Sequence, residues 1–97
     1  MKNYIVSWDI KDGENEYHQK VVVQVRKLYS EQAKVGLFRK VLRNFYACKV
    51  GRYEGLGGVY ALENDYRAIE LSDIREISEI EAFNIAQVRA IYSLELH

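Results

Sequence analysis

This 97-residue sequence has one cysteine and two histidines, residue types that bind zinc and take part in nucleophilic catalysis: Cys48, His18 and His97. A structural zinc site uses about four cysteine or histidine ligands at short spacings, and these three are widely separated along the chain. Cys48 would need His18 beside it in space to become a nucleophile, whereas a lone cysteine is more typical of a packed apolar side chain. We therefore expect no catalysis, no metal site and no cofactor.

Carboxylates gather in residues 54–81, which contain eight acidic and two basic residues. Apolar residues interleave with them, which indicates folded structure rather than a solvated acidic tail. Carboxylates at fixed spacings can imitate the phosphates of a duplex and compete for a basic DNA-binding groove, and Tyr60 and Tyr66 would anchor such a surface. The acidic partner-binding candidates are Glu54, Glu63, Asp65, Glu70, Asp73, Glu76, Glu79 and Glu81. The alternative is a solvated edge of the fold that binds nothing.

Basic residues gather earlier, from Arg26 to Arg52. The aromatic residues that interleave with them or follow them directly are Tyr29, Phe38, Phe45, Tyr46 and Tyr53. Such a mixture can bind single-stranded nucleic acid through phosphate charge and base stacking. The candidates for that interaction are Lys34, Arg39, Lys40, Arg43, Lys49 and Arg52. The sequence pI of 6.7 is below the value of about 9 that dedicated nucleic-acid binders exceed. The alternative places the phenylalanines in the core and the charges on a solvated helix face.

Length and composition predict one globular domain over residues 1–97, since 48% of the residues are apolar and 29% are charged. The net charge is zero, yet residues 1–53 carry +6 and residues 54–97 carry −6. This asymmetry indicates charged partners, unless the two halves pack together and neutralise each other through surface pairs. The sequence contains no apolar run of membrane-spanning length and no signal-peptide pattern, and its single cysteine favours a cytoplasmic setting.

The elements that would position these groups begin with a β-hairpin. Residues 4–10 and 17–25 alternate between apolar and polar side chains, as strands do, around the turn signal Asp12-Gly13. Residues 31–45 then show an apolar stripe at helical spacing after the capping candidate Ser30.

The second half continues with a strand over residues 46–53 and a hairpin, VYALE and YRAIEL, around Asn64-Asp65. Ser78 and Glu81 have the spacing of a capping box, which predicts a short helix at about 79–87, and alternation from Val88 onward predicts a closing strand. The predicted order is ββαβββαβ. The fold class is therefore α+β: an antiparallel sheet with an N-terminal hairpin, one amphipathic helix on one face, and a short second helix on the same side.

The opening hairpin KNYIVSWDIKDGENEYHQKVVV, the helix SEQAKVGLFRKVLRN, the chain length and the charge-biased second half together resemble small single-domain proteins of phages and mobile elements. Among these, the chain is similar in kind to anti-CRISPR inhibitors of type I surveillance complexes. The resemblance covers most of the chain but includes no specific motif, so it transfers no functional residue. It implies a stoichiometric binder without catalysis, and some members of the group act as DNA mimics.

We therefore expect a non-enzymatic inhibitor that binds a host CRISPR-Cas (Cascade-like) complex in the host-cell cytoplasm and blocks its DNA binding. It would be a monomer or weak dimer without membrane contact. The alternative is a small nucleic-acid-binding protein that uses the basic helix face. A third hypothesis, an assembly protein that pairs sheet edges between copies, would show a concentration-dependent dimer.

Overall fold

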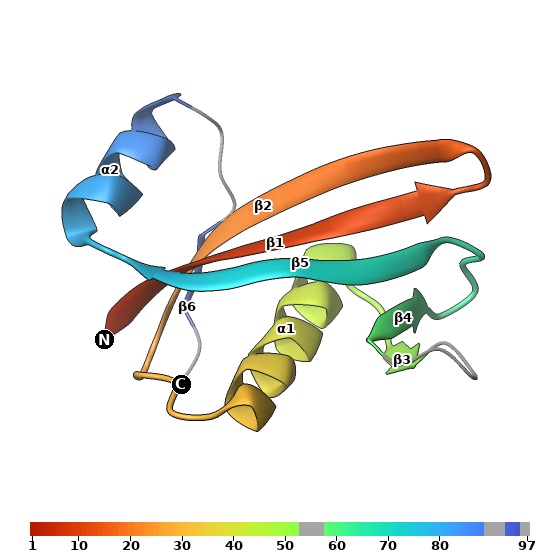
Figure 1. Ribbon diagram of the computed structural model, residues 1–97, viewed down its shortest axis with the longest axis horizontal. Helices are drawn as coiled ribbons and strands as arrows, with labels where there is room; N and C mark the ends of the chain where they lie inside the picture. Colours follow the sequence, from red (N-terminus) through yellow and green to blue (C-terminus); the bar gives the residue numbers. More distant parts are fainter. Residues whose placement is uncertain (53–57, 89–92, 96–97) are drawn as a thin grey trace.

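The computed structural model describes residues 1–52, 58–88 and 93–95. In these ranges the chain forms β1 (Lys2–Asp12), β2 (Asn15–Val25), α1 (Glu31–Tyr46), β3 (Val50–Arg52), β4 (Val59–Leu62), β5 (Ala68–Ile77), α2 (Glu79–Val88) and β6 (Ser93–Glu95). The strands form one sheet in the order β3-β4-β5-β1-β2-β6 (Figure 1). The predicted α+β class and element order are confirmed.

Strand β1 is the centre of the sheet, because it pairs antiparallel with β2 on one side and β5 on the other. The β1–β2 hairpin turns at Gly13, whose φ of 63° is one that glycine adopts without strain. The β1–β5 register shifts at Ser7/Trp8, which marks a bulge. The pairings among β1 to β5 are all antiparallel, as expected, whereas β6 runs parallel to β2.

Helix α1 crosses one face of the sheet and covers it with an apolar stripe. Ser30 caps the helix by accepting a hydrogen bond from the backbone N–H of Ala33 at 3.1 Å. Glu31 adds a negative charge to the first turn, which the helix dipole favours. The buried residues of the stripe are Leu37, Phe38, Val41 and Leu42. The predicted amphipathic helix is confirmed, with its end one residue later than expected.

Trp8 lies at the centre of this core and has 0% of its surface exposed. Its ring packs against Phe38 and meets the edge of Phe45, with centroid distances of 6.1 and 5.3 Å. Its Nε1–H donates a hydrogen bond of 3.0 Å to the hydroxyl of Tyr46. Because an unpaired buried N–H costs about 1–3 kcal/mol, this bond favours one position for the end of α1 on β1.

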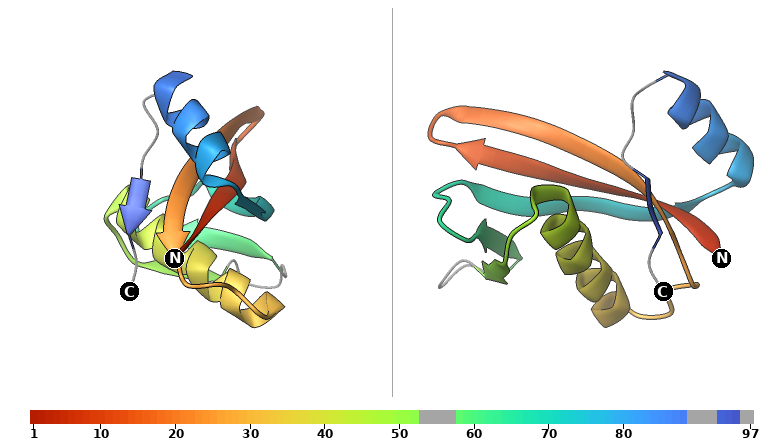
Figure 2. Two further views of the ribbon diagram at one scale, coloured as in Figure 1. Left: turned by 90° about the vertical axis from the view of Figure 1, so that its left-hand side faces the viewer. Right: turned by 180° about the vertical axis from the view of Figure 1, so that it is seen from behind.

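The two helices lie on opposite faces of the sheet, so the expectation that both lie on one side is wrong (Figure 2). Successive side chains of a strand point to opposite faces, and Ile5 therefore points away from the α1 core. A second apolar cluster forms there from Ile5, Val22 and Ile77, with Ala82 and Ile85 of α2 packed against it. The same face continues along the hairpin with the polar residues Ser7, Asp9, Lys11, Glu16, His18 and Lys20. We call this polar part the open face.

Two predicted boundaries are wrong. The strand expected over residues 46–53 is only Val50–Arg52, because α1 runs to Tyr46 and Ala47 then adopts a left-handed conformation with a φ of 53°. The closing strand was expected from Val88, which instead belongs to α2, and the described part of that strand is Ser93–Glu95. The short predicted helix at 79–87 is confirmed as Glu79–Val88.

Candidate functional site

The exposed face of α1 carries basic side chains close together. Arg39, Lys40 and Arg43 are all exposed, and their spacings of one, three and four residues place them on neighbouring turns of the helix. Arg39 donates a hydrogen bond of 3.3 Å to the carbonyl of Val50, which ties α1 to β3. Among the described residues, none of these three forms an ion pair, so their charges are available to an anion.

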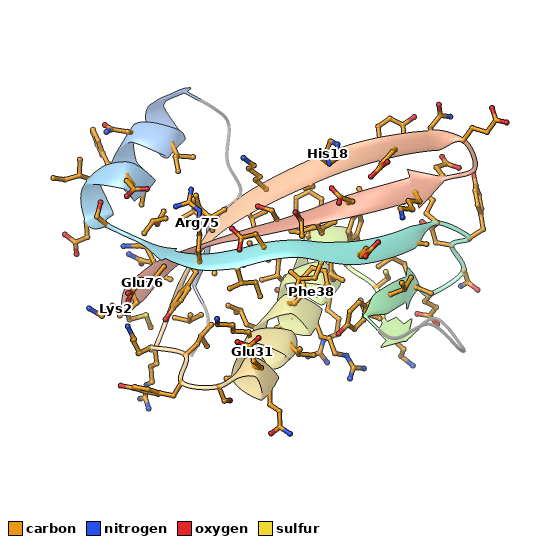
Figure 3. All side chains as sticks on the ribbon, viewed as in Figure 1. Lys2, His18, Glu31, Phe38, Arg75 and Glu76 are labelled. Atoms are coloured by element: carbon orange, nitrogen blue, oxygen red, sulfur yellow. The ribbon has the colours of Figure 1, made fainter. Side chains whose placement is uncertain are left out.

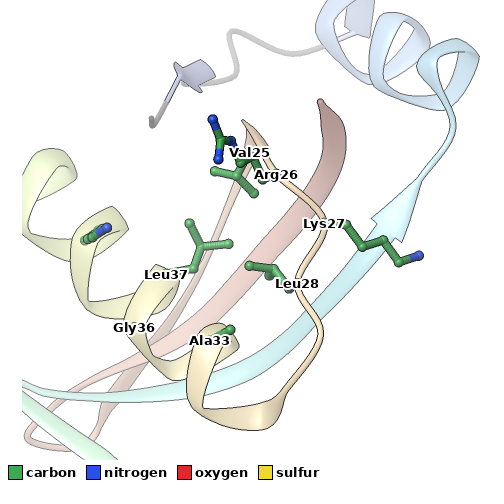
Figure 4. Close-up of a pocket in the computed structure, with 8 residues that line it drawn as sticks. Val25, Arg26, Lys27, Leu28, Ala33, Gly36 and Leu37 are labelled. Carbon is green, nitrogen blue, oxygen red and sulfur yellow. The ribbon is translucent and has the colours of Figure 1, made fainter.

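A hollow of about 350 Å³ lies between α1 and the connection from β2 to α1. Leu28 and Leu37 point toward each other across it, whereas Lys27 points away (Figure 4). Gly36 also lines the hollow, and a Cβ at that position would meet no atom within 4 Å. The complete lining is Val25, Arg26, Lys27, Leu28, Ala33, Gly36, Leu37 and Lys40. The lining thus combines apolar side chains with the bases Arg26 and Lys40, and we call the hollow the basic groove.

Only one of the aromatic residues predicted to stack on bases lies exposed beside this groove. Tyr29 follows the groove residue Leu28 and is 88% exposed. Phe38 is buried, and Phe45 and Tyr46 are half-buried around Trp8. These three rings are therefore core residues, in agreement with the alternative that the sequence left open. Tyr53 lies outside the described residues.

Two of the other basic candidates, Lys34 and Lys49, do not line the basic groove. Lys34 forms an ion pair of 3.4 Å with Glu31 on the same helix. Lys49 is exposed just before β3, beyond the end of α1. The side chain of Arg52 lies outside the described residues. Sequence reasoning missed Arg26 as a groove residue, although it lies in the basic region and only two residues before Leu28.

The acidic candidates are spread over three separate regions. The β4–β5 turn carries Glu63 and Asp65, strand β5 carries Glu70, Asp73 and Glu76, and the first turn of α2 carries Glu79 and Glu81. Within β5, Glu76 lies opposite Tyr4 on the α1 side, whereas Asp73 lies opposite Ser7 on the other side. Arg75 and Glu76 accordingly point away from β5 in different directions (Figure 3). Glu54 lies outside the described residues.

Basic partners neutralise most of these carboxylates. Ion pairs join Glu70 to Lys11 (3.4 Å), Glu76 to Lys27 (3.2 Å), Asp65 to Arg67 (2.6 Å), Asp73 to Arg75 (3.6 Å) and Glu81 to Arg75 (3.8 Å). Glu63 and Glu79 are exposed and form no ion pair within the described ranges. The hypothesis that the acidic residues share one outward, unneutralised surface is therefore wrong. Lys11 and Lys27 of the first half pair with Glu70 and Glu76, and Arg67 and Arg75 of the second half pair with the other three carboxylates.

The two tyrosine candidates differ. Tyr60 is buried and meets the edge of Phe38 with a centroid distance of 5.2 Å. It is a core residue and is not accessible to a partner, which corrects the prediction. Tyr66 is 77% exposed in the β4–β5 turn, as a docking residue must be.

The β4–β5 turn lies beside the β1–β2 turn, because Lys11 pairs with Ala68 where the strands end. A side-chain hydrogen bond to Asp12 raises the pKa of Tyr66 and links the two turns. We call Asp12, Glu14, Glu63, Asp65 and Tyr66 the acidic tip. Lys49 lies beside it, since its carbonyl accepts a hydrogen bond from the N–H of Glu63 at 2.9 Å, and Arg67 is paired with Asp65. The tip therefore keeps only a small excess of negative charge.

Cys48 and His18 lie on opposite faces of the sheet, so they form no nucleophile pair. Cys48 packs against the core on the α1 side, whereas His18 lies on the open face with Nδ1 against Oδ1 of Asp9. The possible ligand atoms of Asp9, Glu16 and His18 all lie within 4.8 Å of one another. Sequence reasoning tested only sets of cysteine and histidine and missed this group.

Comparisons with protein-family models, with curated proteins and with solved structures found no match. No helix in the described part of the chain is long and apolar enough to cross a membrane.

Asp65 has a structural role that separates it from the other acidic candidates. Its carboxylate accepts hydrogen bonds from the backbone N–H of Arg67 at 2.9 Å and from the guanidinium of the same residue at 2.6–3.1 Å. These bonds hold the pKa of Asp65 below its usual value. The ionised form is therefore favoured in the folded protein and stabilises it at neutral pH.

We predict that Asp65→Asn lowers the free energy of unfolding at pH 7 by about 1 kcal/mol, because it removes a charge-assisted pair. The lowered pKa means that the contribution of Asp65 is complete above about pH 4 and is lost as the pH falls through the folded-state pKa. Urea unfolding of both proteins from pH 7 to pH 2 should show the difference closing in acid. Glu63→Gln is the control and should change stability by less than about 0.5 kcal/mol. A difference that is independent of pH would contradict this role.

Proposed function

We propose that this protein is a non-enzymatic binding protein that takes single-stranded nucleic acid into the basic groove. The observation that carries the proposal is an apolar hollow lined also by Arg26 and Lys40, with the exposed ring of Tyr29 next to it in the chain and Arg39 and Arg43 exposed on the same helix. Phosphates would lie along the helix face at Arg39, Lys40 and Arg43. A base would stack on Tyr29 or enter the hollow beside Leu28.

The charge distribution on α1 supports an anionic partner. Like charges at spacings of three and four residues destabilise a helix by a few tenths of a kcal/mol per pair. Glu31 is the only acidic residue of α1, and it is already paired with Lys34. Bound phosphates would remove the repulsion and release counterions from the nucleic acid. Stacking on Tyr29 would add about 1–3 kcal/mol for a base of any sequence.

Fluorescence anisotropy with labelled DNA and RNA oligonucleotides over a range of salt concentrations tests the proposal. The double variant Lys40→Gln/Arg43→Gln should weaken binding and reduce the slope of log Kd against log salt by about 1.4, since each phosphate contact on a single strand contributes roughly 0.7. Tyr29→Ala should weaken binding by about 1–3 kcal/mol without changing the slope.

The matched control for charge is Lys11→Gln/Lys20→Gln, which removes two bases from the open face, and the matched control for the aromatic ring is Tyr66→Ala. Both controls should bind like the wild type. Absence of binding at low salt would contradict the proposal, and so would equal losses in the control and groove variants.

A second candidate function is the inhibitor that the sequence resembles, and the acidic tip favours it. Exposed Tyr66 lies among carboxylates from two turns, and aromatic residues are frequent anchors in protein interfaces. On this account the tip, rather than residues 54–81 as a whole, would dock in the DNA-binding groove of a type I CRISPR surveillance complex. The smaller set retains Glu63, Asp65 and Tyr66 from the sequence prediction and adds Asp12 and Glu14.

A competition assay tests this second function: the protein is added to purified type I surveillance complexes, and the binding of target DNA is measured. Glu14→Lys/Glu63→Lys should weaken inhibition at least tenfold, because both changes reverse charge at the tip. Glu31→Lys/Glu79→Lys reverses the same number of charges in the first turns of α1 and α2 and should inhibit like the wild type. The account fails if the wild type displaces no DNA, or if the two variants are equally impaired.

A further inference from the structure

The geometry points to a binding site for a first-row divalent cation, with Zn²⁺ as its representative, at Asp9, Glu16 and His18 on the open face. The possible ligand atoms of these residues lie within 4.8 Å of one another. Ligands bound to one Zn²⁺ at about 2.1 Å are separated by about 3.4 Å when tetrahedral. Small side-chain rotations would therefore bring all three onto one ion. The site is distinct from the basic groove and does not depend on the proposed function.

The β1–β2 register brings these residues together. Asp9 pairs directly with His18 across the two strands, and directly opposite residues have Cβ atoms about 4.5–5.5 Å apart. Glu16 is two residues before His18 on β2, so its side chain points to the same face. Two strands joined by a tight turn thus present one nitrogen and two carboxylate groups at a fixed spacing.

The contact between His18 and Asp9 restricts the orientation of both side chains in the absence of a metal ion. Nδ1 of His18 lies against Oδ1 of Asp9, and the carboxylate of Asp9 is only 26% exposed, whereas the side chain of His18 is 71% exposed. A carboxylate against an imidazole restricts the orientation of the ring. The ion would therefore meet a partly ordered pair that remains accessible from solvent.

Charges around the site favour a cation. Three carboxylates lie on this part of the open face, from Asp9, Glu16 and Glu70, against two lysines, Lys11 and Lys20. Lys11 forms an ion pair with Glu70 at 3.4 Å. The carboxylates of Asp9 and Glu16 would therefore remain available to bind the ion. A mixed set of imidazole nitrogen and carboxylate oxygen suits zinc and its first-row neighbours, whereas Mg²⁺ and Ca²⁺ prefer oxygen ligands alone. Three protein ligands would leave the remaining position to water.

The test is calorimetric titration of Zn²⁺ into the chelator-treated 97-residue chain. We expect one site per chain, which tenfold excess Mg²⁺ does not block. Glu16→Gln and His18→Asn should each weaken binding at least tenfold, since loss of even an outer partner of a ligand typically costs 10–100-fold. Because bound ligand stabilises the folded state, Zn²⁺ should raise the Tm of the wild type more than that of either variant.

Three control variants separate this site from other zinc ligands in the chain. Glu14→Gln makes the same chemical change two residues away on the hairpin, and His97→Asn and Cys48→Ser remove the other soft ligands. All three should bind Zn²⁺ like the wild type. The proposal is overturned if Zn²⁺ does not bind, if binding persists unchanged in Glu16→Gln and His18→Asn, or if it is lost in a control variant.

Discussion

The pairing of β1 with both β2 and β5 is the constraint on which the rest of the structure depends. One side of β1 carries Trp8, whose hydrogen bond to Tyr46 holds the end of α1 against the sheet. The other side carries Asp9, which meets His18 across the hairpin. A single period-two pattern therefore builds the core on one face and places polar groups on the other. The groove forms where the chain leaves β2 and returns as α1.

The same pairing decides which charges remain available. Strand β5 lies beside β1, and Lys11 accordingly meets Glu70, while Lys27, just beyond β2, reaches Glu76. Surface pairs of this kind contribute little to stability, but they remove the free negative charge that DNA mimicry along β5 would require. The bases on the outer face of α1, by contrast, form no ion pair among the described residues, and Arg39 reaches only a backbone carbonyl of β3. Positive charge therefore stays accessible on α1, and negative charge is mostly neutralised on the sheet.

Local patterns in the sequence predict the elements well, and long-range pairing explains what they miss. The turn at Gly13 and the cap at Ser30 are readable from the sequence, and both are observed. The β1–β5 pairing joins residues that are far apart in the sequence, from Lys11 with Ala68 to Asn3 with Ile77. Its bulge brings Glu70 and Asp73 to one face, although their odd spacing would separate them in a regular strand. The buried ring of Tyr60 could not be distinguished from an exposed one by local pattern alone. The pairing of Asp9 with His18 could have been predicted from the sequence, because the position of the hairpin turn sets the β1–β2 register.

The central claim is that the groove between α1 and the β2–α1 connection is where this protein binds its partner. A ¹H–¹⁵N NMR titration of the labelled protein with a short single-stranded oligonucleotide tests it most directly. The expected chemical-shift changes are concentrated at Arg26–Tyr29, Gly36, Arg39, Lys40 and Arg43, with the open face and the acidic tip unchanged. Shifts concentrated on the open face or at the tip, or no shifts at low salt, would contradict it.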